Sequence, residues 1–316
     1  MKAPARLGLY GLILVAVFTA AGLTANAVIP EDTVRAWVEE SAEGHGAGHG
    51  DGADTSSLGL GLAQDGYQLT SVSAPAGTGE ASELTFAVTG PDGNRVTDFD
   101  LDHEQEMHLI AVRADGQHFA HVHPEKNQDG TWSIPWQWEA AGTYRIFADF
   151  VPAQSDEGIT LSTAVQVSGD FEPVAAEQAV QTTFDGFDVT VEGDLVAGSA
   201  SELTFMITRY GEPVTSLEPY LGAFGHLVAL RDGDLAYLHA HPHGGTSVAG
   251  ETSGPEIVFE ATAPTEGRYL LYLDFQVDAQ AHTASLVIDA TGNNSDGASS
   301  GDSENDEHEQ GEGHDD

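Results

Sequence analysis

The sequence MHLIAVRADGQHFAHVHPE, from Met107 to Glu125, returns almost as a copy in GHLVALRDGDLAYLHAHPH, from Gly225 to His243. In each copy a histidine opens an apolar segment, a second histidine follows thirteen positions later, and the unit closes on His-x-His-Pro. An Asp-Gly pair between two apolar runs is a strong signal for a two-residue β-hairpin loop. The repeated histidines are His108, His121, His123, His226, His239 and His241. The duplication indicates two copies of one β domain that carry the same potential metal ligands.

The segments on both sides of these hairpins also form matching pairs. They are residues 82–89 with 201–208, 142–150 with 267–275, and 160–167 with 283–288. The first pair alternates polar and apolar side chains, as half-buried strands do. Short strands separated by Gly, Pro and Asp turns favour an antiparallel β-sandwich. We therefore expect an all-β chain of two tandem antiparallel β-sandwich domains, immunoglobulin-like or cupredoxin-like, at residues 58–170 and 171–290.

The N-terminal sequence predicts export. Lys2 and Arg6 precede an uncharged stretch that runs to Ile29 and is long enough to cross a bilayer, which takes about 20 residues. Ala25-Asn26-Ala27 also fits a signal-peptidase site. Residues 1–29 are therefore a signal peptide or a hydrophobic helix that anchors the chain in the membrane, and we favour the anchor. The rest of the chain is expected outside the cytoplasm, tethered to the cell membrane, or secreted if cleaved after Ala27.

Two segments of the chain have the composition of unstructured sequence. Residues 30–57 are expected to be a flexible linker that ends in a Gly-rich run. Residues 291–316 are expected to be a disordered acidic tail, because Asn, Ser, Gly, Asp and Glu bury no core. Each segment carries two histidines, at positions 45, 49, 308 and 314. These histidines either bind metal weakly or belong to a solvated spacer.

The charge of the chain is strongly one-sided, with 51 acidic against 10 basic side chains and a formal net charge of -41. Such a surface repels nucleic acid and anionic lipid, so we expect no nucleic-acid partner and membrane contact only through the N-terminal segment. Like charge spread along a lysine-poor chain is typical of proteins from a high-salt habitat, where salt screens the repulsion. The absence of cysteine excludes disulfides, thiolate metal sites and a cysteine nucleophile.

The hairpin loops allow the histidines to be placed on the sheet. With Asp115-Gly116 as the loop, Ile110 lies opposite His121 and His108 lies opposite His123. Side chains two apart share a face of a strand, so these three imidazoles project from one side. With Asp232-Gly233 as the loop, His226 lies opposite His239, and His241 shares their face. Three imidazoles on a rigid sheet suit Cu(II) or Zn(II), and we expect copper before zinc.

A structural interpretation of the same histidines stays open. Asp149 and Asp274 occupy matching positions in the predicted strands at residues 142–150 and 267–275. A buried carboxylate needs a partner, so histidine–aspartate pairs across the core would satisfy both groups without a metal. The same carboxylates could instead orient metal-bound imidazoles from behind. The pattern also leaves open whether the duplication makes two separate sites or one composite site.

The chain resembles an uncharacterised group of exported actinobacterial proteins that share the pattern H-L-[IV]-[AV]-[VL]-R … [FY]-x-H-x-H-P. The pattern matches His108 to Pro124 and His226 to Pro242. The chain is also similar, more weakly, to small exported β-sandwich proteins of the YtkA-like type. The resemblance covers most of residues 58–290 and implies export and paired immunoglobulin-like or cupredoxin-like domains, without an established activity.

The functional expectation is binding rather than catalysis. The sequence has no Gly-x-Ser-x-Gly, no phosphate loop and no His-Glu-x-x-His. We expect an extracytoplasmic, non-catalytic protein that binds or delivers a transition metal, copper before zinc, with another envelope protein as a possible recipient. The alternative is an envelope interaction module with structural histidines that binds a protein or a glycan.

Overall fold

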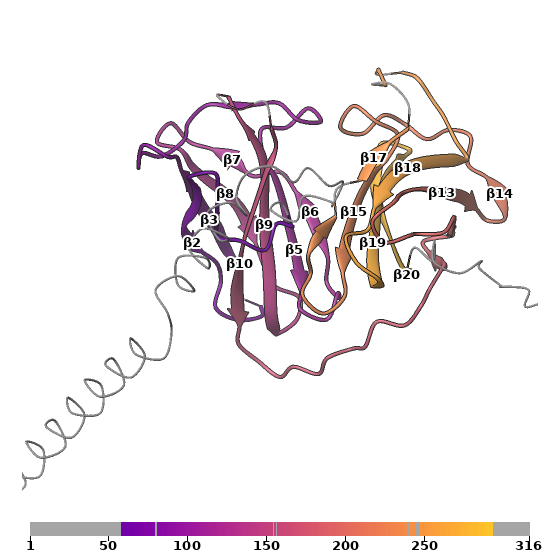
Figure 1. Cartoon of the computed structure of the whole chain (residues 1–316), viewed down its shortest axis with the longest axis horizontal. Coiled ribbons are helices and arrows are strands. Elements are labelled where there is room, and N and C mark those ends of the chain that lie inside the picture. The colour runs from indigo at the N-terminus through magenta and orange to yellow at the C-terminus, as the bar shows by residue number, and fades with distance from the viewer. Residues whose placement is uncertain are drawn as a thin grey trace, which may run out of the picture. The chain divides into compact units, whose positions relative to one another are not determined.

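The computed structural model describes residues 58–79, 81–153, 155, 157–238, 240–243, 247–248 and 250–292 (Figure 1). The predicted anchor or signal peptide, the linker, most of the acidic tail, and His239 lie outside the described residues. Within them the regular elements are all β-strands, and no helix is long and apolar enough to cross a membrane. The expected all-β fold of two tandem antiparallel sandwiches is confirmed.

The first sandwich has two antiparallel sheets. The outer sheet has the order β1-β2-β3-β8-β7 and the inner sheet the order β10-β9-β5-β6, with β4 paired to β9. The outer strands are β1 (Ala63–Gln64), β2 (Tyr67–Ser73), β3 (Ser82–Thr89), β8 (Thr131–Trp136) and β7 (Glu125–Lys126). The inner strands are β10 (Ile159–Val167), β9 (Gly142–Pro152), β5 (His108–Arg113), β6 (Ala120–Val122) and β4 (Phe99–Asp100).

The second sandwich repeats this strand order. Its outer sheet is β11-β12-β13-β18-β17, with β14 paired to β13, and its inner sheet is β20-β19-β15-β16. The outer strands are β11 (Gln181–Phe184), β12 (Phe187–Glu192), β13 (Ala200–Arg209), β18 (Glu256–Thr262), β17 (Ala240–Pro242) and β14 (Glu212–Pro213). The inner strands are β20 (Gln280–Ala290), β19 (Gly267–Val277), β15 (His226–Arg231) and β16 (Tyr237–Leu238). The shared order shows that the sequence repeat is a repeat of structure.

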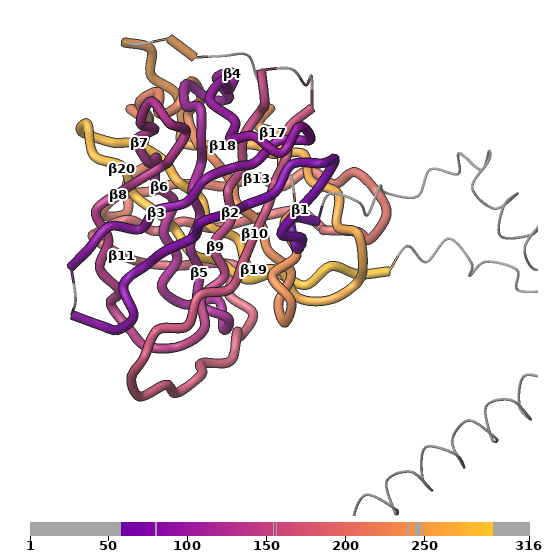
Figure 2. Tube along the Cα trace, turned by 90° about the vertical axis from the view of Figure 1, so that its left-hand side faces the viewer, coloured from indigo at the N-terminus to yellow at the C-terminus, as the bar shows by residue number. Residues whose placement is uncertain are grey.

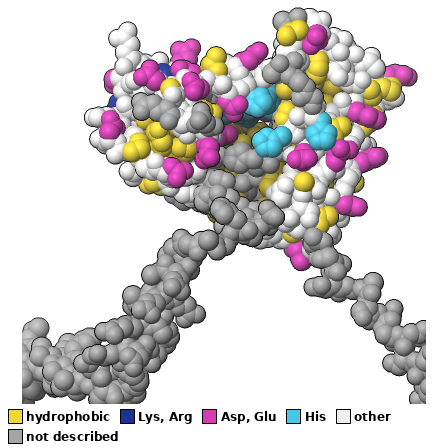
Figure 3. All heavy atoms as spheres, turned by 45° about the horizontal axis from the view of Figure 1, so that its top comes forward, with side chains coloured by type: hydrophobic (Ala, Val, Ile, Leu, Met, Phe, Trp, Pro, Cys, Tyr) yellow, Lys and Arg dark blue, Asp and Glu magenta, His cyan; other side chains and the backbone are white. Residues whose placement is uncertain are grey.

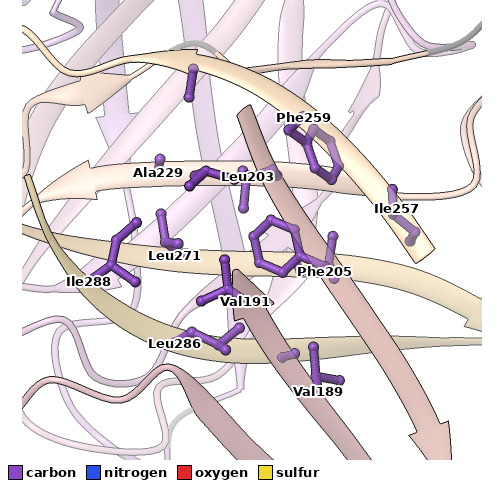
Figure 4. Packing of buried hydrophobic residues seen from close by; sticks show 14 of the residues in the cluster. Val189, Val191, Leu203, Phe205, Ala229, Ile257, Phe259, Leu271, Leu286 and Ile288 are labelled. Carbon is purple, nitrogen blue, oxygen red and sulfur yellow. The ribbon is translucent and has the colours of Figure 1, made fainter. Parts of the chain in front are cut away.

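Each sandwich has its own apolar core between its two sheets. Alternate residues of each strand point inward, so the buried side chains of one sheet face those of the other. In the first core Phe86 and Trp132 stack with ring centroids 6.4 Å apart. Figure 4 shows the second core, where side chains such as Val191, Phe205 and Leu271 meet from both sheets.

A third apolar cluster joins the two sandwiches through their inner sheets. On β5, Leu109 and Ala111 face the first core, while Ile110 and Val112 face the second sandwich. Burial on both faces explains why β5 and β15 are apolar at consecutive positions instead of alternating. In Figure 2, seen from the side of the first sandwich, its strands lie in front of those of the second.

Aromatic side chains and hairpin loops reinforce this interface. Phe119 stacks on Tyr272 with ring centroids 3.9 Å apart and an interplanar angle of 4°. The Tyr272 hydroxyl donates a hydrogen bond of 2.6 Å to the carbonyl of Gly116, in the first hairpin loop. The two inner sheets therefore meet along a packed, specific surface, which brings side chains at their edges together.

The two hairpins test the predicted register. Ile110 pairs with His121, so the count from Asp115-Gly116 is confirmed. The count from Asp232-Gly233 is wrong by two residues, because Ala229 pairs with Leu238. The turn is centred on Gly233-Asp234 instead, and two contacts fix it there. The Asp234 carboxylate accepts a hydrogen bond from Arg231 Nε at 3.0 Å, and Leu235 is buried in the cluster between the sandwiches.

Candidate metal centre

The first hairpin brings three imidazoles together. His108 begins β5, His121 lies in β6, and His123 follows β6 directly. His108 Nδ1 is 3.0 Å from His121 Nε2 and 3.3 Å from His123 Nε2. The ligand atoms of all three residues lie within 4.8 Å of one another. Because His108 and Ile110 share a face of β5, the triad lies at the edge of the interface between the sandwiches.

In His108 and His121, the ring nitrogen that does not face the other histidine has its own hydrogen-bond partner, and this partner defines which nitrogen carries the hydrogen. His108 Nε2 is 3.0 Å from the carbonyl oxygen of Asp102, which only accepts, so Nε2 carries the hydrogen and Nδ1 presents a lone pair. His121 Nδ1 is 2.8 Å from Asp274 Oδ2, so Nδ1 donates and Nε2 presents a lone pair. Two lone pairs therefore point at each other across 3.0 Å. This arrangement calls for a positive charge at that point, supplied by a proton or by a metal ion.

Two of the nitrogen separations are close to those around a bound metal ion. Metal–nitrogen bonds of about 2.0–2.1 Å in a tetrahedral site place two nitrogens about 3.3 Å apart. The two separations from His108 Nδ1, 3.0 and 3.3 Å, require little movement to meet this value. Three protein ligands leave a tetrahedral ion with one open position, which is the pattern of sites that exchange a ligand.

Burial favours the neutral, metal-binding form of His108 and His123. Burial lowers the pKa of His123 to about 3, and the neighbouring His121 and His108 lower it further in the same direction. Burial and the proximity of His121 also lower the pKa of His108. Protons therefore compete weakly with a metal ion for these two residues at neutral pH.

The two predicted orienting carboxylates have different partners. Asp274, on β19 of the second sandwich, accepts the hydrogen bond from His121 across the interface, and both side chains are buried. Asp149, on β9, lies opposite His108 in the sheet ladder and accepts a hydrogen bond of 2.8 Å from Thr160 Oγ1. Among the described residues, Asp274 alone takes the predicted position behind one of the repeated histidines, and it comes from the other repeat.

The two described members of the second repeat's histidine set, His226 and His241, are arranged differently from the triad. His226 is buried, and its Nε2 is 3.0 Å from the carbonyl of Tyr220, six residues upstream, as His108 is from Asp102. His241 is exposed on β17 and pairs with Glu260 in the outer sheet. The expectation that His241 shares a sheet face with His226 is therefore wrong, because the chain has already crossed to the outer sheet. Among the described residues the first-repeat triad is the one three-ligand group.

A cavity of about 160 Å³ adjoins the triad between the two sandwiches. Its wall includes His108 and His121 from the first repeat and His226 and His241 from the second. Figure 3 shows histidine side chains gathered around a hollow on this face, with acidic groups nearby.

His103 also lines this cavity, and its ring meets His226 edge-on with centroids 4.6 Å apart. The sequence offers His103 as a weaker candidate than the repeated histidines, because no histidine stands at the matching position of the second repeat. The sequence signal for His103 was its position, four residues before the hairpin motif that begins at Met107.

The sequence of the chain matches a known protein family in two places. The family described as "Domain of unknown function (DUF8832)" matches residues 62–169 and again residues 181–292. The chain belongs to this family. The two matches correspond to the two sandwiches, so the DUF8832 domain occurs here in tandem. No curated protein matches the chain in sequence.

Solved structures give remote likenesses. Salmonella alpha-2-macroglobulin matches 71% of this chain with 15% identity and a TM-score of 0.25, and the chain spans 15% of that protein. The bacterial integrin-binding protein invasin matches 70% of the chain with 12% identity and a TM-score of 0.20, over 38% of its own length. A conserved domain protein from Bacillus anthracis matches 78% with 9% identity and a TM-score of 0.23, over 96% of its length. None of these likenesses bears on function.

Proposed function

We propose that this DUF8832 protein is an extracytoplasmic, non-catalytic protein that binds a transition metal ion at His108, His121 and His123 and delivers it to another envelope protein. The observation that carries the proposal is the pair of lone pairs on His108 Nδ1 and His121 Nε2, held 3.0 Å apart by backbone and carboxylate partners behind them. Export rests on the uncharged N-terminal segment, which tethers the chain or is cleaved after Ala27.

The ligand set favours copper before zinc. Divalent copper binds a given nitrogen site more tightly than zinc does, and three imidazoles suit both ions. Met107, the one soft side chain next to the triad in sequence, is buried in the first core on the opposite face of the strand. The site therefore offers nitrogen donors and one open position, which supports reversible binding and transfer.

The size of the cavity supports binding over catalysis. Pockets for organic ligands commonly measure about 300–1,000 Å³. The cavity beside the triad measures about 160 Å³, which admits an ion with water more readily than an organic substrate.

The test is metal titration of the full chain in detergent, with bound copper and zinc counted by mass spectrometry after removal of loose metal. The double variant His121→Ala/His123→Ala is expected to lose a tightly bound ion. The matched control, His308→Ala/His314→Ala, removes two tail histidines and is expected to keep it. Circular dichroism melting shows whether each variant is folded. Tight binding that survives in the folded triad variant would overturn the proposal.

A second candidate is an envelope interaction module whose histidines are structural and whose partner is a protein or a glycan. The contact between His121 and Asp274 favours it, because this buried pair ties one repeat to the other without any need for a metal. In that case the triad variant loses stability equally in the presence and absence of metal, and the wild-type chain binds no ion tightly.

A further inference from the structure

The cavity beside the triad contains a second pair of imidazoles, and this inference rests on the proposed metal binding. His103 comes from the first repeat and His226 from the second. Their ring centroids are 4.6 Å apart with an interplanar angle of 85°. The ring of His103 is also 6.3 Å from that of His108, a member of the triad. The two groups of imidazoles therefore share one small cavity.

The protonation of His226 is set in the same way as that of His108. His226 Nε2 is 3.0 Å from the Tyr220 carbonyl oxygen, so it donates there and Nδ1 keeps its lone pair. The residue is only 8% exposed, and the ladder pairing of β15 with β19 fixes its position opposite Asp274. A buried imidazole with a fixed tautomer is a preformed metal ligand.

His103 is the more exposed residue of the pair. It lies in the turn between Asp102 and Gln105 with a backbone φ of 45°. Its side chain is 38% exposed, while its ring still contacts that of His226 in an edge-to-face arrangement. The same turn provides the Asp102 carbonyl that holds His108. The position of His103 is thus tied both to the cavity wall and to the triad.

We propose that His103 and His226 form a second, weaker metal site, at which an ion first binds from solvent before it moves to the triad. Two imidazoles hold an ion less tightly than three, and water completes its coordination. One ligand is exposed and the other buried, so the pair spans the distance from solvent to the inner cavity. Because the ligands come from different repeats, this loading site exists only where the two sandwiches pack together.

The test uses the full chain with Cu(II) or Zn(II) and the variant His103→Asn, since asparagine tolerates the left-handed backbone. The control is His118→Asn, which changes an exposed histidine at a φ of 53° outside this cavity. Wild type and control are expected to bind a tight ion and a second, weaker ion. His103→Asn is expected to lose the weaker ion, keep the tight one, and load the triad more slowly in stopped-flow mixing.

A further variant, His226→Gln, keeps an amide donor for the Tyr220 carbonyl and is expected to lose the weaker ion as well. The loading-site proposal is overturned if the weaker ion is absent from wild type, survives in His103→Asn, or disappears equally in His118→Asn. Failure of the triad proposal gives a different result, in which His121→Ala/His123→Ala leaves the tight ion in place.

Discussion

The substitution Asp274→Asn tests whether the second repeat controls the proposed metal site of the first. The Asp274 carboxylate accepts a hydrogen bond of 2.8 Å from His121 Nδ1, and both side chains are nearly buried, at 7% and 5% exposed. The carboxylate fixes the orientation and the tautomer of the ring, so that Nε2 faces the other two imidazoles. Loss of such a partner weakens metal affinity by about 10- to 100-fold, or about 1.4 to 2.7 kcal/mol. Asparagine preserves the size and an accepting oxygen, so the variant isolates the charge.

Asp149→Asn is the matched control for this prediction. Asp149 occupies the equivalent ladder position in the first repeat, opposite His108. Its carboxylate accepts a hydrogen bond from Thr160, as that of Asp274 does from Thr283, but among the described residues no histidine donates to it. Its substitution is expected to change metal affinity much less. Affinity is measured on the full chain by competition with a chromophoric chelator at constant pH, alongside thermal melting. Equal losses in both variants, or unchanged affinity in Asp274→Asn, would refute the assignment of Asp274 to this role.

Three further predictions concern stability. Burial lowers the pKa of His226 to about 3 from 6.5, so below pH 6.5 the unfolded chain takes up a proton that the folded chain does not. The free energy of unfolding therefore falls as pH drops, by about 2 kcal/mol at pH 5. In urea unfolding, His226→Gln should lose less stability than wild type over the same drop in pH, by this amount. Tyr272→Phe removes the hydrogen bond to Gly116 and should cost about 1 kcal/mol in urea unfolding, whereas unchanged stability would contradict that contact. Phe119→Ala removes the ring stacked on Tyr272 and should lower stability by about 2–3 kcal/mol, with non-additivity in the double variant as the check.

The repeat made the fold predictable. Two matching segments are expected to adopt the same structure. The turn residues and the alternation of polar and apolar side chains in one copy therefore supported the same interpretation of the other copy. The first hairpin register followed from its loop, and Ile110 pairs with His121 as counted. The predicted register of the second hairpin was wrong because its Asp-Gly pair, Asp232-Gly233, lies one residue earlier in the repeat than Asp115-Gly116 does. Burial of Leu235 between the sandwiches, a tertiary contact, fixed that turn instead.

The site was predictable only in part, because half of it lies between the repeats. Periodicity places His108, His121 and His123 on one face, and the structure brings them together. Periodicity does not show which surface covers that face. The partnership of His121 with Asp274 and the approach of His103 to His226 both arise from packing of the inner sheets. Consecutive apolar positions in β5 and β15 were the sequence sign that both faces of these strands are buried.

Two copies of one hairpin end in different environments because the chain leaves the inner sheet at different points. In the first repeat the outer sheet is joined at Glu125, so His123 still lies over His108. In the second repeat Ala240 already pairs with β18, which places His241 at the surface beside Glu260. The ladder positions stay equivalent, since the Ala229–Leu238 pair corresponds to Ala111–Ala120. Among the described residues, the first repeat therefore supplies the three clustered imidazoles, and the second supplies the carboxylate that contacts one of them, His121.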